Sequence, residues 1–297
     1  MVVEPVGAAA DDTRAARLLR AYDEALREEA EIVGAQSWDR DGPLLRAVFD
    51  DEFGFVSYRS LAGVDGPDGG HALDALIART VEHFRDATDV SEVEWKTRGH
   101  DRPADLLDRL TRHGFDAQEP ETVMIGEAEL LAVDVPLPAG IRVRRLGVDA
   151  LGRPQPVEVL RADLERSLAL QLLVFGDPSH LSVDSLVRAA VERPDEVQHW
   201  VAEVVGPDGA GAEVVSAGRL ERVPGTAFAG IWGGATAPPW RGRGIYRALT
   251  SARAEAALAL GVRYLHSDST QDSRPILERS GLVAVTTTTP CLWRRTA

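Results

Sequence analysis

The feature that most constrains the fold is a passage from an apolar strand through a glycine-rich loop into a helix. Residues 227–235 are apolar and predict a strand, and residues 245–260 have the Ala, Leu and Arg content of a helix. Between them, Gly242 and Gly244 leave the backbone without side chains. The first amides of a helix have no partner within it and lie at the positive end of its dipole. This passage therefore predicts a cradle for an anion such as phosphate.

Three arginines, Arg241, Arg243 and Arg247, add positive charge around this loop. A glycine-rich turn before a surface helix has the same local pattern, but the strand before the loop and the elements after it favour a binding site. The loop lacks the Gly-Lys-Ser/Thr of a Walker loop. It is not a dinucleotide fingerprint either, because that motif follows the first strand of a βαβ unit and has an acidic residue about 20 positions later.

The composition limits the classes of partner and compartment. A net charge of −14 argues against nucleic acid, which needs a basic face, and favours a cationic small molecule. No apolar run is long enough for a membrane span and the first residues lack a signal peptide, so we expect a cytoplasmic protein without membrane contact. The single cysteine, Cys291, excludes a cysteine-based zinc site, and we expect no metal. Lys96 is the only lysine among 33 basic residues, which indicates a GC-rich bacterial genome.

At 297 residues the chain is long enough for two domains. Hydrophobic periodicity and turn residues predict strands and helices in both halves. The expected helices cover residues 11–33, 71–87, 103–113, two or three stretches within 151–191, 245–260 and 272–280. The expected strands cover residues 44–49, 53–61, 90–97, 121–125, 141–146, 200–205, 213–223, 227–235, 264–268 and 282–293. The proline-rich segment 134–140 is the best linker, which gives domains at 1–133 and 141–297.

The two halves share a spacing that indicates an internal duplication. Asp101 precedes Gly114 by the thirteen residues that separate Asp268 from Gly281. Both glycines are followed by an apolar residue, and each comes after a helix that lies between two strands. The order of the elements carries this inference, because single apolar positions often match by chance.

The loop also carries a family likeness. Arg241-Gly-Arg-Gly-Ile-Tyr246 resembles the Arg/Gln-x-x-Gly-x-Gly/Ala signature of the GCN5-related N-acetyltransferases, the GNAT superfamily. A proline and an aromatic residue precede it as they do in that family, and residues 274–282 look like the family's last helix. The likeness covers residues 141–293 and, more weakly, 95–125, so the chain resembles a tandem GNAT protein with a degenerate N-terminal copy. It implies an α/β (α+β) fold of two domains, each with a mixed, mostly antiparallel sheet flanked by helices.

The resemblance implies that acetyl-CoA is a co-substrate. In that family the loop amides hold the pyrophosphate, and amides at the end of the preceding strand hold the pantetheine arm and polarise the thioester carbonyl. Carried over to this chain, the coenzyme-binding residues are Ala235, Thr236, Ala237, Arg241, Gly242, Arg243, Gly244, Ile245, Tyr246, Arg247 and Ser273.

This sequence departs from the family pattern at two places. Tyr246 takes the last Gly/Ala position of the signature, which would put a phenol on the coenzyme or acceptor side. Leu277 takes the place of a tyrosine that protonates the departing thiolate in many members, so a serine or threonine of the segment 269–273, or water, would have to replace it. In the first half, Gly70 and Asp74 stand where the loop would be; an aspartate repels phosphate, and we expect no coenzyme there.

The general base is left open by the sequence. No carboxylate lies on the strand 227–235, and the nearest acids on neighbouring strands are Glu203, Glu213 and Glu221. Asp268 ends the following strand and could also cap a helix. His199 and His266 have suitable ordinary pKa values. We take Thr236, Ser273, Asp268 and Glu221 as the candidate catalytic residues.

Together these features predict a bacterial N-acetyltransferase, monomeric or homodimeric, that moves an acetyl group from acetyl-CoA to a primary amine of a small molecule by direct transfer. The acidic balance favours a cationic acceptor such as a polyamine or aminoglycoside. Two alternatives stay open. One is a non-catalytic sensor or scaffold that binds acyl-CoA, and the other is an acyltransferase that uses a longer acyl or an aminoacyl donor.

Overall fold

The computed structural model describes residues 13–49, 52–64, 70–176, 182–206 and 211–295. Its α-helices are α1 (Arg14–Ala25), α2 (His71–Ala87), α3 (Leu106–Arg112), α4 (Val157–Phe175), α5 (Val183–Glu192), α6 (Ile245–Ala259) and α7 (Arg274–Arg279). Three short 3₁₀ helices are η1 (Glu28–Ala30), η2 (Ala128–Leu130) and η3 (Pro238–Trp240). The first two residues of the predicted helix 11–33 lie outside the described residues.

The strands of the first half are β1 (Ser37–Asp41), β2 (Leu44–Phe49), β3 (Phe53–Ser57), β4 (Glu92–Arg98), β5 (Asp116–Ala117) and β6 (Glu121–Glu127). Those of the second half are β7 (Ile141–Arg145), β8 (Val197–Val205), β9 (Gly211–Arg222), β10 (Phe228–Thr236), β11 (Tyr264–Ser269) and β12 (Val283–Arg294). They form one continuous sheet in the order β1-β2-β3-β4-β12-β6-β11-β10-β9-β8-β7, with β5 paired to β12. Among these described strands only β3–β4 and β10–β11 are parallel, which confirms the mixed, mostly antiparallel sheet flanked by helices.

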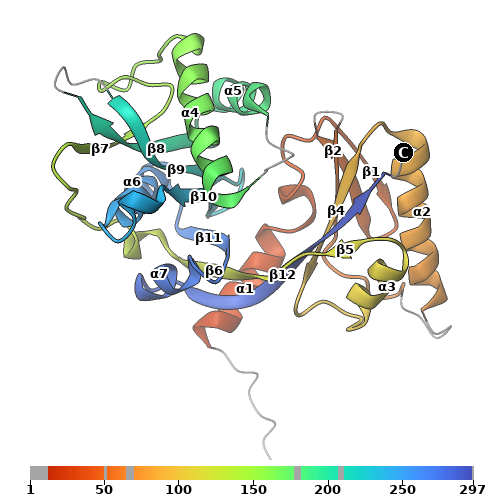
Figure 1. Cartoon of the computed structure of the whole chain (residues 1–297). Coiled ribbons are helices and arrows are strands. Elements are labelled where there is room, and N and C mark those ends of the chain that lie inside the picture. Colours follow the sequence, from red (N-terminus) through yellow and green to blue (C-terminus); the bar gives the residue numbers. More distant parts are fainter. Residues whose placement is uncertain (1–12, 50–51, 65–69, 177–181, 207–210, 296–297) are drawn as a thin grey trace, which may run out of the picture.

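The two halves exchange their last strands at the centre of this sheet. β6, from the first half, pairs with β11 of the second. β12, from the second half, pairs with β4 of the first and runs across the middle of the molecule from one half to the other (Figure 1). Strand pairing therefore joins the two halves at four places, β6–β11, β6–β12, β4–β12 and β5–β12, although the segment 134–140 separates them in sequence.

The strand register repeats the internal spacing seen in the sequence. β6 and β12 pair Ile125 with Val283 and Met124 with Ala284. The separation between Gly114 and Gly281 can be added to the β6 residues and subtracted from the β12 residues of these pairs. This gives the pairs Leu292–Asp116 and Cys291–Ala117, and both are present. The exchanged strands are thus related by an approximate twofold axis that passes between β6 and β12.

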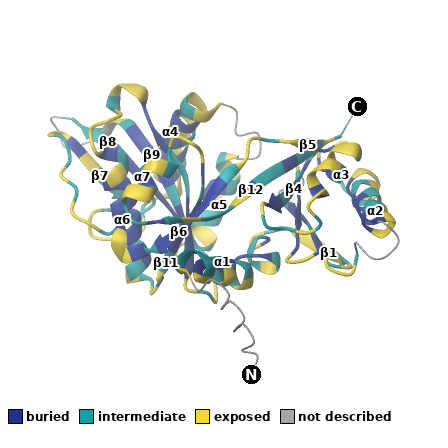
Figure 2. Ribbon diagram, turned by 90° about the horizontal axis from the view of Figure 1, so that it is seen from below, coloured by how far each residue is buried: buried dark blue, intermediate teal, exposed yellow. Residues whose placement is uncertain are grey.

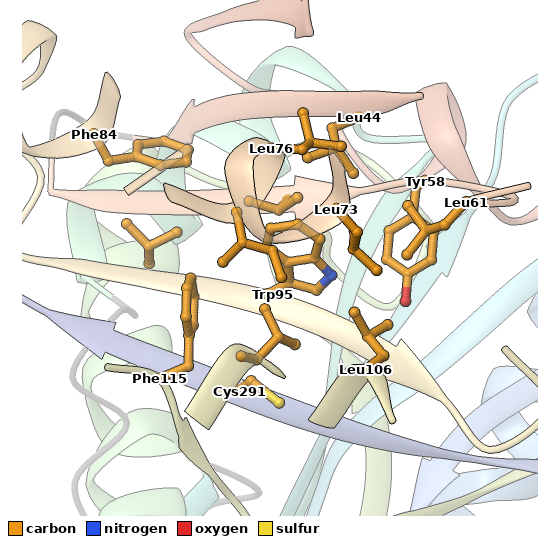
Figure 3. Packing of buried hydrophobic residues seen from close by; sticks show 14 of the residues in the cluster. Leu44, Tyr58, Leu61, Leu73, Leu76, Phe84, Trp95, Leu106, Phe115 and Cys291 are labelled. Atoms are coloured by element: carbon orange, nitrogen blue, oxygen red, sulfur yellow. The ribbon is translucent and has the colours of Figure 1, made fainter. Parts of the chain in front are cut away.

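Each half has its own hydrophobic core. In the first, α2 and α3 cover one face of the sheet around Trp95, whose ring meets Phe115 edge-on at 5.9 Å. Cys291 of β12 packs in this core (Figure 3), and burial raises the pKa of its thiol to about 12. In the second half, α4 and α5 cover one face of the sheet and α6 and α7 the other. Figure 2 shows the buried residues concentrated on the central strands and the inner faces of the helices.

Helix α1 lies against the exchanged strands, where Leu18 and Tyr22 pack on β6 and on Phe228 of β10. The predicted helix 11–33 is longer than the observed one. The helix ends at Ala25 because Glu28 takes a positive φ of 57° and its amide bonds to Ser57 Oγ. The strand β1 has no counterpart in the prediction, since it is a polar, exposed edge strand without apolar alternation.

Candidate active site

The glycine loop after β10 leads directly into helix α6, as the sequence predicts. Gly242 and Gly244 both have positive φ, 73° and 80°, which a residue with a Cβ adopts only under strain. A Cβ built at Gly242 would meet nothing within 4 Å, so the loop surface there is open. Arg241 Nε donates to the carbonyl of Thr236 at 3.1 Å and ties the loop to the strand end.

Helix α6 begins at this loop with free amides. The first backbone bond at its start runs from Ala248 N to Gly244 O at 2.9 Å. Among the described residues, no backbone carbonyl accepts from the amides of residues 242–247. The first turn contains no acidic residue, and Arg243 and Arg247 are exposed beside it. Such a helix start attracts an anion.

β10 and β11 separate partway along their length. They are paired at Phe228–Tyr264, Ala229–Leu265 and Gly230–His266, and no further. Beyond this point β11 continues to pair with β6, while β10 pairs with β9 through a bulge between Trp232 and Ala235. The strand that leads into the glycine loop therefore has one unpaired edge over its last residues.

A buried cation lies beneath the bulge. Arg253, on α6, is 1% exposed, and its guanidinium donates to the carbonyls of Arg219 and Trp232 at 3.2 and 3.5 Å and to Thr250 Oγ1 at 3.1 Å. Its partners in the described chain are neutral oxygens, the hydroxyl of Tyr246 among them. The sequence suggested an exposed phenol on the coenzyme or acceptor side, but the Tyr246 ring lies half-buried against Gly234.

A cavity of about 260 Å³, the inter-half pocket, opens on the α1 face of the sheet where β10 and β11 separate. A row of register partners, Glu221, Gly230 and His266, crosses its floor. The Trp232 ring lies over Gly230, where a Cβ would come within 2.3 Å of the indole nitrogen. The lining comes from both halves: Tyr22, Leu26, Ala30, Glu31, Phe55, Glu94 and Lys96 from the first, and Glu221, Val223, Trp232, His266 and Asp268 from the second.

The pocket contains an ion pair between the halves. Lys96 Nζ lies 2.5 Å from Asp268 Oδ2. Burial would raise the pKa of Asp268, but the charge and hydrogen bond of Lys96 outweigh it and hold the pKa below its ordinary value. Burial raises the pKa of Glu94 to about 7, and Lys96 only partly offsets this. Glu94 is therefore a better proton acceptor at neutral pH than Asp268.

The pocket also holds polar atoms without partners. His266 is 7% exposed, and neither of its ring nitrogens has a hydrogen-bond partner among the described residues. Burial lowers its pKa to about 4, so the imidazole is neutral at pH 7. Asp268 Oδ1 likewise has no partner in the described chain. His199, the other candidate histidine, lies outside the pocket, and burial lowers its pKa to about 3.

Of the four candidate catalytic residues, Glu221 and Asp268 line the inter-half pocket and the other two do not. Thr236 Oγ1 is 2.8 Å from Ser216 Oγ within the sheet. Ser273 is at the start of α7, where the hydrogen bonds of its hydroxyl with Thr270 are long, at 3.4 Å. The amide of Ala237 donates to Val215 O at 2.9 Å and is thus engaged in the sheet. Leu277 is 1% exposed in the core under α7.

Sequence reasoning missed the pocket residues of the first half, above all Glu94 and Lys96. One signal was available: along β4 the charged residues Glu94, Lys96 and Arg98 alternate with buried Val93, Trp95 and Thr97, so the second face of the strand is charged. No group of metal-ligating side chains occurs in the described ranges. A search of the same ranges finds no helix long and apolar enough to cross a membrane.

Comparison with known proteins identifies the fold. No protein-family model and no curated protein matches the sequence. Among solved structures, a GCN5-related N-acetyltransferase from Kribbella flavida matches 96% of this chain and 97% of its own, with a TM-score of 0.61 and 16% identity. A tandem GNAT protein from the clavulanic acid biosynthesis pathway matches 97% of this chain and 96% of its own, with a TM-score of 0.56 and 16% identity. A GCN5-related N-acetyltransferase from Sphaerobacter thermophilus matches 96% and 88%, with the same TM-score and identity. The family likeness is thus confirmed at the level of the fold.

Proposed function

From the tandem fold of the GCN5-related N-acetyltransferases, we propose that this chain transfers an acetyl group from acetyl-CoA to a primary amine of a small molecule. The observation that carries the proposal is the open start of α6, where residues 242–247 present amides without backbone acceptors in the described chain, beside three arginines. These groups fit a pyrophosphate, because they combine amide donors with formal positive charge and an unobstructed glycine surface.

The unpaired edge of β10 supports the same function. A thioester held by the loop would extend along the last residues of β10 toward the point where β10 and β11 separate. The buried guanidinium of Arg253 lies beneath this stretch and favours negative charge there, as preorganised donors do in acyl transfer. Acetyl-CoA supplies the activated acyl group. The chain binds it, orients it toward the inter-half pocket and excludes water there.

Direct transfer requires that the amine lose a proton and that the thiolate gain one. The new bond joins the amine nitrogen to the acyl carbon as the carbon–sulfur bond breaks. The carboxylates that line the pocket, and so could accept the proton of an amine there, are Glu31, Glu94, Glu221 and Asp268. Because the Leu277 side chain has no acidic proton, water or the Ser273 hydroxyl would protonate the thiolate.

A second candidate function is a sensor that binds acyl-CoA without transfer, which the replacement of an acidic hydroxyl by Leu277 favours. Release of free thiol in the presence of amines separates the two. Acyl donors of different lengths, including aminoacyl thioesters, would show whether acetyl is the group transferred.

A pair of matched variants tests the coenzyme site. We expect Gly242→Glu to weaken acetyl-CoA binding at least tenfold in calorimetric titration, since it puts a carboxylate among the phosphate-binding amides. Gly225→Glu is the control: Gly225 has the same φ of 73° and the same open surroundings, but lies before the start of β10, at the other end of that strand from the loop. Equal affinities in the two variants would remove the loop from the site.

A further inference from the structure

We propose that the inter-half pocket binds the acyl acceptor and selects a primary amine with a compact apolar body, one positive charge and no carboxylate. The proposal rests on the proposed function and names the substrate class of that same site. Three properties of the pocket support it: its unpartnered polar atoms, its charge and its size.

The unpartnered polar atoms call for a ligand with N–H donors. Asp268 Oδ1 only accepts hydrogen bonds while its other oxygen holds Lys96, and it has no donor in the described chain. Neutral His266 offers one accepting nitrogen and one donating N–H, and both lack partners in the described chain although the ring is only 7% exposed. Buried polar atoms are rarely left in this state. A ligand with N–H groups would supply the donors that these acceptors lack.

The charges in the pocket call for a single cation. Four carboxylates line it, and three of them have basic partners: Glu31 with Arg98, Glu221 with Arg219 and Asp268 with Lys96. The Glu94 side chain alone has no ion pair or hydrogen bond within the described residues, so it is the one acid of the pocket without a basic partner. An ammonium would supply that partner, whereas a carboxylate on the acceptor would place a second acid beside Glu94 and be rejected.

The size and lining of the pocket limit the rest of the molecule. A volume of about 260 Å³ corresponds to roughly nine water molecules and lies just below the range of drug-sized sites. Tyr22, Phe55 and Trp232 supply aromatic surface, and Leu26 and Val223 add aliphatic surface. This suits an arylalkyl or alkyl amine. Its single unpaired acid leaves the further charges of a polyamine or an aminoglycoside without partners.

Glu94 then has a second role. The acceptor enters as an ammonium and must lose a proton before its nitrogen can attack the acyl carbon. Glu94 faces the pocket beside Lys96 on its own strand, with Glu31 and Asp268 contributed by neighbouring segments. Burial raises the pKa of its carboxyl to about 7, which suits a group that accepts a proton at neutral pH.

The test is calorimetric titration of the full chain with 2-phenylethylamine, with phenylalanine, which adds a carboxylate, and with 2-phenylethanol, which lacks the charge. We expect 2-phenylethylamine to bind at least tenfold more tightly than either analogue. Glu94→Gln should weaken this binding at least tenfold, and Val223→Phe should abolish it by filling the pocket. Glu129→Gln, at an exposed position, should leave it unchanged.

Equal binding of phenylalanine, or full affinity in Glu94→Gln or Val223→Phe, would overturn the proposal. A titration of the same variants with acetyl-CoA separates it from the proposed function. Normal acetyl-CoA binding with no amine binding refutes this pocket alone. Selective amine binding in a chain that does not bind acetyl-CoA supports the pocket and refutes the acetyltransferase.

Discussion

The two helices that connect parallel strands, α2 between β3 and β4 and α6 between β10 and β11, start with the same backbone conformation in opposite surroundings. Both begin at a glycine in the left-handed region, Gly70 with φ 84° and Gly244 with φ 80°. At α2, Arg109 donates to Gly70 O at 3.2 Å and to Asp74 at 2.7 Å, and a Cβ on Gly70 would meet its guanidinium at 2.5 Å. At α6 the nearby arginines, Arg241, Arg243 and Arg247, are exposed, and the first turn contains no acidic residue.

The regions beyond the two parallel strand pairs differ in the same way. After β3 the chain fills its own interior: Tyr58 is fully buried and donates to Asp101 at 2.5 Å, and Arg27 pairs with the same carboxylate at 3.0 Å. Beyond the last paired residues of β10 and β11, Trp232 and Asp268 line the inter-half pocket. Two regions with similar backbones therefore differ in their side chains. In the first half these side chains fill the space beyond the parallel strands, and in the second half they leave a pocket there.

The largest effect is expected when a buried side chain in either core is truncated. This experiment tests whether the two halves unfold independently. Phe84→Ala in the first half should cost about 3 to 5 kcal/mol and Leu265→Ala in the second about 2 to 5, because both side chains are fully buried. Since the sheet is continuous, each variant should shift one cooperative transition in urea, followed by circular dichroism. Two separate transitions, each sensitive to only one variant, would contradict this.

A somewhat smaller effect is expected from breaking the ion pair that joins the halves. Lys96→Met should cost about 3 kcal/mol at pH 7, because it leaves the buried Asp268 carboxylate without a cation. The double variant Lys96→Met/Asp268→Leu should recover most of the loss. A purely steric effect of the introduced methionine would not allow this recovery.

The pH dependence of that loss has a defined sign. The folded-state pKa of Asp268 is depressed, so its contribution is present above its unfolded pKa near 4 and lost as the pH falls through the folded value. The folded-state pKa of Lys96 is raised, so its contribution is lost only when the pH rises above about 10. The difference between wild type and Lys96→Met, measured by urea unfolding, should therefore be largest between about pH 4 and pH 10.

The smallest effect is expected at the filled helix start. Arg109→Ala removes the cation over Gly70 and should cost about 1 kcal/mol or less, because its acidic partners are partly exposed. It should leave the single acetyl-CoA equivalent unchanged in calorimetry, since Asp74 still faces the first turn of α2. A second binding equivalent in this variant would show that Arg109 alone separates the two helix starts.

The sequence was informative where local chemistry decides the structure. The predicted helix 71–87 matches α2, and the predicted helix 245–260 matches α6 to within one residue. The exchange of β6 and β12 had no local signal, because strand pairing depends on contacts between residues far apart in the chain. For the same reason the inter-half pocket could not be foreseen: Lys96 and Asp268 meet only after the exchange has placed β4 and β11 on either side of β12 and β6. The domain limits and the catalytic roles stay predictions.

The exchanged strand β12 also sets the order in which the protein can be completed during synthesis. Trp95 and Phe115 are translated well before Cys291, which packs against the same core. The edge of β4 therefore stays uncovered, and the core of the first half incomplete, until β12 has been made.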